Sequence, residues 1–197
     1  MEKLSRREFL NQLVSMGLVA FFPFLLRERQ ISGLIRPPGS VFESLFNKLC
    51  FRCGVCFKTC PAHCLWPVPL DLGLNSWGSP YIIPRKAGCL RCGACGRACP
   101  SAAIRPVPTE QVKMGTAKIN PALCLVWQSG KECLVCLEYC PVGAVILDEK
   151  GRPSVEPSLC VGCGLCEENC PVTGSVAAIT VSTKGEKRYY PKENKYR

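Results

Sequence analysis

Apolar residues are distributed unevenly along this chain. One continuous apolar run lies near the start, over residues 13–26 (LVSMGLVAFFPFLL). The segment 42–49 (FESLFNKL) repeats its apolar residues at the three- and four-residue spacing of an amphipathic helix. Beyond residue 50 the apolar positions form only short stretches, such as 81–83, 117–119 and 144–147, bounded by glycine and proline. Such stretches are typical of small β-hairpins, so the pattern predicts an α+β chain of short helices and hairpins.

A fourfold cysteine repeat begins at residue 50. Each copy, here called a run, has four cysteines and ends in proline. Runs one, two and four have the spacing C-x2-C-x2-C-x3-C-P, whereas run three begins with the stretched spacing C-x8-C. The runs are Cys50, Cys53, Cys56 and Cys60; Cys89, Cys92, Cys95 and Cys99; Cys124, Cys133, Cys136 and Cys140; and Cys160, Cys163, Cys166 and Cys170.

This spacing is that of bacterial ferredoxins, in which three thiolates hold one [4Fe–4S] cluster and the fourth cysteine ligates the other cluster of a pair. The sequence therefore predicts that the sixteen cysteines of the runs bind four [4Fe–4S] clusters. Zinc sites favour two cysteine pairs separated by a longer loop. A disulfide framework is disfavoured by the odd total of 17 cysteines and by their tight, regular spacing.

Glycine follows the second cysteine in three of the runs, as Gly54, Gly93 and Gly164, and Leu134 takes that place in run three. Without a Cβ, these glycines are expected to let backbone N–H groups approach cluster sulfur and to contribute to cofactor binding. Cys64 is the seventeenth cysteine, four residues after Cys60. It is predicted to be either an alternative ligand or redox sensor, or a small buried side chain near the first cluster.

Two pairings of the runs are compatible with the sequence. The 19 residues between runs three and four match an ordinary two-cluster ferredoxin, which suggests that run one pairs with run two and run three with run four. The nested alternative pairs run one with run four and run two with run three. Either arrangement gives two pseudo-symmetric two-cluster modules.

Composition and charge agree with a cluster protein. Apolar residues make up 47% of the chain, including the cysteines, and 17 Gly and 17 Pro limit regular structure. So small a core needs metal to be stable. Each oxidised cluster with four thiolates carries a charge of about −2, so four of them offset most of the formal +10 and leave about +2. The basic balance is therefore no sign of nucleic-acid binding.

The N-terminal region has the features of an export signal. Ser5–Leu10 (SRREFL) reads as a twin-arginine motif, and the apolar run follows it. With no small-residue cleavage site after that run, the segment is expected to remain as an uncleaved membrane anchor; the alternative is a basic amphipathic helix docked on the protein. Twin-arginine export carries folded proteins, which would protect the thiols from an oxidising compartment.

Four regions are predicted: 1–30 as signal or anchor, 31–48 as linker and short helix, 49–183 as the four-cluster domain, and 184–197 as a basic tail. The tail is expected to be a solvated end, or else to dock an acidic partner or lipid headgroups.

The motif SRREFL, the apolar run, RPPG at 36–39, the four runs with the third stretched, and Lys113-Met114-Gly115-x-Ala117 together resemble the NapG/MauM-type ferredoxins. The resemblance covers nearly the whole chain and favours the nested pairing. It implies a periplasmic-face protein that accepts electrons from a membrane-integral quinol dehydrogenase and passes them to a cytochrome c or terminal reductase.

The resulting prediction is an electron carrier without a substrate site of its own, since no Rossmann glycine pattern, P-loop or catalytic triad is found. Two other functions remain open: the tightly bound electron-transfer subunit of a molybdenum oxidoreductase, and a cytoplasmic polyferredoxin.

Overall fold

The computed structural model describes residues 33–172, 174 and 176–189. The predicted signal or anchor segment, residues 1–30, lies outside these ranges. Within the described ranges no helix has both the length and the apolar character needed to cross a bilayer.

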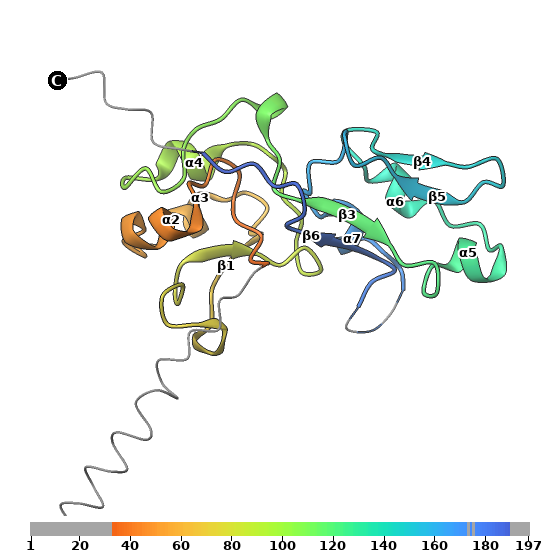
Figure 1. The fold of residues 1–197 in the computed structure, drawn as a ribbon, viewed down its shortest axis with the longest axis horizontal. Helices are drawn as coiled ribbons and strands as arrows, with labels where there is room; N and C mark the ends of the chain where they lie inside the picture. Colours follow the sequence, from red (N-terminus) through yellow and green to blue (C-terminus); the bar gives the residue numbers. More distant parts are fainter. Residues whose placement is uncertain (1–32, 173, 175, 190–197) are drawn as a thin grey trace, which may run out of the picture.

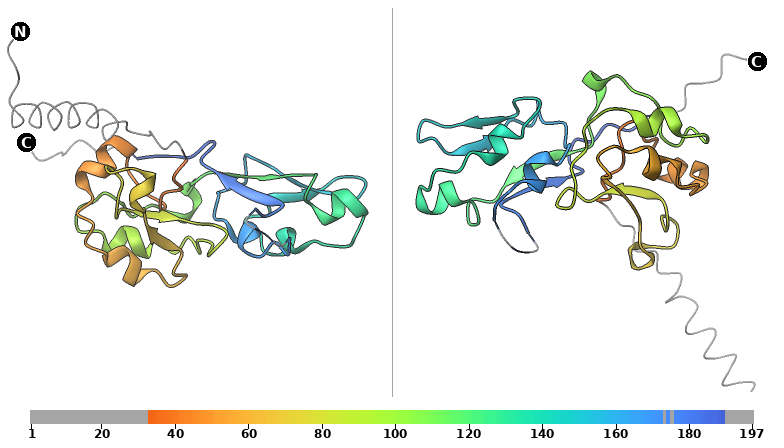
Figure 2. Two further views of the ribbon diagram at one scale, coloured as in Figure 1. Left: turned by 90° about the horizontal axis from the view of Figure 1, so that it is seen from below. Right: turned by 180° about the vertical axis from the view of Figure 1, so that it is seen from behind.

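Two halves lie side by side along the long axis of the molecule, and each is built from short elements (Figures 1 and 2). The first half contains α2 (Glu43–Leu49), α3 (Val55–Thr59), β1 (Leu65–Pro67), the 3-10 turn η1 (Leu70–Leu72), β2 (Pro80–Ile82) and α4 (Ala94–Ala98). A connection with the 3-10 turn η2 (Thr109–Gln111) leads into the second half. That half contains β3 (Thr116–Ile119), α5 (Leu125–Ser129), α6 (Val135–Glu138), β4 (Val145–Leu147), β5 (Pro153–Val155), α7 (Leu165–Glu168) and β6 (Ile179–Ser182).

Three two-stranded antiparallel sheets support the halves, and the predicted α+β class is confirmed. β1 pairs with β2, and β4 with β5, as the apolar stretches near them predicted. The expected hairpin at 117–119 is wrong, because β3 pairs with β6 at the far end of the chain, with Ile119 opposite Ile179. The side chains of Ala117 and Ile179 are buried in the core of the second half, and this burial stabilises the pairing of the two distant strands.

The apolar core is small in both halves. In the first half it gathers around Val41, Phe46 and Ile104, each 2% exposed or less, and in the second around Ala144 and Ile179. Buried cysteines complete both cores. The thiols therefore make up part of the interior, as the low apolar content predicted.

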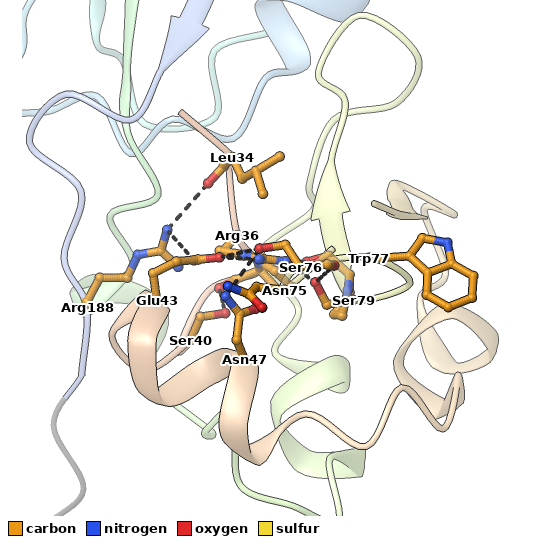
Figure 3. A network of polar contacts seen from close by, with 12 residues as sticks. Leu34, Arg36, Ser40, Glu43, Asn47, Asn75, Ser76, Trp77, Ser79 and Arg188 are labelled. Atoms are coloured by element: carbon orange, nitrogen blue, oxygen red, sulfur yellow. Dashed lines mark hydrogen bonds and ion pairs between the residues drawn. The ribbon is translucent and has the colours of Figure 1, made fainter. Parts of the chain in front are cut away.

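A buried arginine fixes the start of the described chain to the first half. The side chain of Arg36, 1% exposed, donates to Ser79 Oγ at 2.9 Å and to the Pro80 carbonyl at 2.7 Å. It also forms a two-pronged ion pair with Glu43 on α2, one prong being Nε to Oε2 at 3.0 Å (Figure 3). The guanidinium lies over the Phe46 ring. One guanidinium thus joins the chain entry, α2 and β2.

The elbow predicted at 36–39 is present and depends on Gly39. Its φ of 85° is left-handed, and a Cβ there would lie 1.9 Å from the Arg105 carbonyl oxygen. Only glycine fits so close to that backbone carbonyl.

The end of the described chain folds back, contrary to the prediction of a solvated tail from residue 184. The backbone N–H of Lys187 donates to the Lys113 carbonyl at 2.8 Å, and Tyr189 donates its hydroxyl to the Gln111 carbonyl at 2.8 Å. Arg188 is 10% exposed and reaches Glu43 at 3.9 Å (Figure 3). Residues 187–189 are therefore part of the fold, and 190–197 lie outside the described ranges.

Candidate metal centres

The cysteine runs share one local design. In each, the third cysteine stands on a short helix: Cys56 on α3, Cys95 on α4, Cys136 on α6 and Cys166 on α7. The chain enters α3, α4 and α7 through Gly54, Gly93 and Gly164, with φ of 78°, 68° and 85°. These glycines supply the left-handed turn that starts each helix. The sequence analysis expected them only to let backbone N–H groups approach sulfur and did not predict this conformational role.

Run three departs from this design. Leu134 has φ of −119°, so α6 begins without the left-handed turn. The stretched spacing leaves room for the extra helix α5, which begins directly after Cys124.

Four cavities of about 320 to 350 Å³ are each lined by four cysteines of the runs. In each, three cysteines come from one run and the fourth is the last cysteine of another. The cavities, named sites A to D, are lined by Cys50, Cys53, Cys56 and Cys99 (site A); Cys60, Cys89, Cys92 and Cys95 (site B); Cys140, Cys160, Cys163 and Cys166 (site C); and Cys124, Cys133, Cys136 and Cys170 (site D).

The pairing is therefore sequential, and the nested pairing favoured by resemblance is wrong. Run one shares its cavities with run two, and run three with run four. The cause is the packing of helices: α3 lies against α4 and α6 against α7. The last cysteine of each run follows its helix and so points into the cavity of the helix packed alongside.

The donor set fits an iron–sulfur cube and not a single ion. Among the described residues, no three Cys, His, Asp or Glu side chains converge tightly enough for one metal ion. A lone zinc needs sulfur donors at about 2.3 Å, whereas these cysteines surround a wider space. Four thiolates around such a space are the ligand set of a [4Fe–4S] cluster.

Burial and hydrogen bonding shift the pKa values of the ligand thiols in both directions. Burial, with the charge of Cys50 nearby, raises the pKa of Cys56 to about 11, and burial beside Cys89 raises that of Cys95 to about 12. In the second half, burial raises the pKa of Cys136 to about 11. At two other ligands the pKa is lowered: a hydrogen bond from Cys64 lowers the pKa of Cys89, and at Cys99 burial is outweighed by hydrogen bonds from Ser101 and backbone N–H groups. Metal binding releases the protons of those thiols that are neutral beforehand.

Several donors to ligand sulfur escaped the sequence analysis. Backbone N–H groups reach sulfur from Arg91 to Cys89 at 3.4 Å, from Ala117 to Cys160 at 3.3 Å and from Ala144 to Cys140 at 3.2 Å. The Ser101 hydroxyl lies 3.5 Å from Cys99 Sγ. The segment around Ala117 was noted for its apolar stretch and for its resemblance, and its separation from run four along the chain gave no sign of this contact.

Sites B and C meet where the halves join. The backbone N–H of Cys89 donates to the carbonyl of Cys163 at 2.7 Å, so a residue of site B is bonded directly to one of site C. Arg85 ties the same surfaces together through three backbone carbonyls at 2.7 to 3.0 Å, those of Glu167, Cys170 and Val172.

The sites therefore follow one another in the order A, B, C, D. The number of buried cysteines is higher at the middle of this row than at its ends: sites B and C each have three buried cysteines, and sites A and D one each. The two inner sites therefore have more buried cysteines than the two outer sites, although Cys92 of site B is exposed.

Profiles of known families match the cysteine runs. The 4Fe-4S dicluster domain matches residues 88–144 and 131–175, and a 4Fe-4S binding domain matches 47–63. The second dicluster match spans runs three and four, which share sites C and D. The first spans runs two and three, which share no cavity. A profile match depends on the spacing of cysteines along the chain, whereas the sites are defined by which cysteines line each cavity.

Whole proteins match over most of their length. The methylamine utilization ferredoxin-type protein MauM of Methylophilus methylotrophus is 35% identical over 174 residues, covering 78% of this chain and 72% of the relative. The ferredoxin-type protein NapG of Escherichia coli K12 is 35% identical over 188 residues, covering 84% and 80%. The ferredoxin-type protein NapF of Haemophilus influenzae is 33% identical over 186 residues, covering 92% and 95%. With this similarity and its cysteine-lined sites, the chain belongs to the MauM/NapG family of ferredoxin-type iron–sulfur electron-transfer proteins.

Proposed function

We propose that this chain carries single electrons through four [4Fe–4S] clusters, held at sites A to D by the sixteen cysteines of the runs. The observation that carries the proposal is the row of four cavities, each lined by four cysteines from two runs. A bound cluster supplies one-electron redox chemistry. The protein supplies the ligands, the burial and the hydrogen bonds to sulfur that set each potential.

The ends of the row are the places for exchange with partners. At site A, Cys53 is exposed, and the neighbouring Phe51 side chain is 71% exposed. Site D lies at the opposite end, and three of its cysteines are half-buried. At each inner site protein covers three of the four cysteines, and at site B the fourth, Cys92, is exposed. Electrons therefore enter at one outer site and leave at the other.

The proposed donor is a membrane-integral quinol dehydrogenase, and the proposed acceptor is a cytochrome c or terminal reductase in the periplasm. The twin-arginine motif at Arg6-Arg7 and the apolar run at 13–26 support export and anchoring at the outer face of the cytoplasmic membrane. Similarity to the ferredoxin-type proteins MauM and NapG supports a role as an electron carrier between such partners.

Anaerobic purification of the full chain from membranes tests the proposal. About 16 iron atoms per chain are expected, together with a co-purifying membrane protein. About 8 would overturn the four-cluster assignment, and co-purification of a molybdenum enzyme in place of a quinol dehydrogenase would overturn the proposed donor.

The location is tested separately with an Arg6→Lys/Arg7→Lys variant. Loss of the protein from the periplasmic face is expected, whereas an unchanged location would exclude the twin-arginine route.

A further inference from the structure

Site B contains a fifth cysteine that its cluster would not need as a ligand. Cys64 lines the cavity with the four cysteines of site B and is only 1% exposed. Its sulfur lies 3.6 Å from Cys60 Sγ, and its side chain also hydrogen-bonds Cys89. Cys64 therefore lies beside two proposed ligand sulfurs, closed off from solvent.

Packing does not require a thiol at this place. The residues four positions after Cys99 and Cys140 are Ala103 and Ala144, and each is 1% exposed. A methyl group thus fills the corresponding space in two other runs. Alanine is therefore sufficient for packing at this position, and the sulfur of Cys64 is not needed to fill the space.

We propose that Cys64 tunes the cluster at site B as a positioning residue, by donating its S–H to the ligand sulfur of Cys60 or Cys89. The inference rests on the proposed cluster at that site. A donor to ligand sulfur stabilises the reduced state, which carries one more negative charge, and so raises the reduction potential. Because Cys64 is buried, it does not act as a solvent-facing redox sensor.

Site A offers an independent example of the same device. Ser101 Oγ lies 3.5 Å from Cys99 Sγ, so a side-chain hydroxyl faces the last cysteine of run two. The corresponding residues after runs three and four are Val142 and Val172, which have no donor in their side chains. Side-chain donors to the last cysteine of a run therefore mark sites A and B of the first half.

The test compares Cys64→Ala, Cys64→Val and Cys64→Ser in the full-length, cluster-loaded protein. EPR-monitored redox titration gives the midpoint potentials, and iron analysis gives the cluster content. Alanine and valine remove the donor, so one of the four potentials should fall while iron stays at the wild-type value. Serine keeps a donor and should restore at least part of the shift.

The size of the shift follows from the strength of one hydrogen bond. Loss of one such bond is expected to change the ratio of reduced to oxidised cluster about fivefold, which is a fall in midpoint potential of about 40 mV at about 59 mV per tenfold change for one electron. Ser101→Ala is the matched control: it should lower a different potential, and the double variant with Cys64→Ala should lower both.

Two results would overturn the inference. In the first, alanine and valine leave all four potentials unchanged, which means that Cys64 only fills space. In the second, they remove about four iron atoms per chain, which makes Cys64 a ligand. Failure of the proposed function looks different, since the wild-type protein itself would then contain fewer than four clusters.

Discussion

Arg36→Met should shorten the lifetime of the cluster-loaded protein more than any change at a surface arginine. Arg36 links Glu43 on α2 to Ser79 and to the Pro80 carbonyl at β2 (Figure 3). Cys50 of site A follows α2 directly, and Pro80 lines site A. Methionine keeps the bulk of the side chain but removes the donor to the Pro80 carbonyl and leaves Glu43 with Ser76 and the more distant Arg188 as its partners, so site A should open first.

The magnitude follows from burial. Removing one partner of a buried ion pair costs about 3–5 kcal/mol, and the lower end applies because the Glu43 side chain is 40% exposed. About 3 kcal/mol corresponds to a rate increase on the order of 100-fold if the network is lost in the transition state for unfolding.

The assay is bleaching of the cluster's visible absorption after rapid mixing into guanidinium chloride under anaerobic conditions. Arg152→Met is the matched control, because Arg152 is 34% exposed and pairs with Asp148 in the β4–β5 turn. That pair contributes less than about 1 kcal/mol and the contact of the Arg152 guanidinium with the Trp127 ring about 0.5 kcal/mol, so the control should change the rate at most about tenfold. Equal bleaching rates in the two variants would refute the reasoning about the Arg36 network.

Three further predictions follow from single contacts. Burial raises the pKa of Glu43, but its hydrogen bond to Arg36 and the charges of Arg36 and Arg188 outweigh this and hold the pKa below its ordinary 4.5. A lowered pKa stabilises the fold above about 4.5 and loses that contribution as pH falls further, so Glu43→Gln should remove part of the acid-induced rise in bleaching rate; an unchanged pH profile would contradict this. In Gly88→Ala the new Cβ would lie 2.7 Å from the Leu165 backbone nitrogen, so EPR should show weaker magnetic coupling between the clusters at sites B and C. Gly151→Ala strains a left-handed residue with φ of 71° in the β4–β5 turn, away from both sites, and should leave the coupling unchanged. Cys60→Ser should alter the EPR signal of the cluster at site B, which takes its other three ligands from run two. The cluster at site A, with three ligands from run one, should be unaffected, and the reverse result would exclude the shared sites.

The sequence alone determined the features that depend on residues close together in the chain. The spacing of Cys50, Cys53 and Cys56 is enough to group three donors, because a loop of two residues brings each thiol to the next. The apolar spacing over 42–49 likewise predicted α2, and the proline–glycine elbow at 36–39 is present.

Only the tertiary structure decided what depends on packing between distant segments. Cys60 and Cys99 follow helices of similar length, so nothing in their spacing says which cavity each enters; the contact of α3 with α4 decides it. The pairing of β3 with β6 and the bond from Cys89 to Cys163 also join segments more than 50 residues apart. The order of the sites and the place of Cys64 depend on such contacts, which local spacing cannot encode because many distant pairings satisfy the same local pattern.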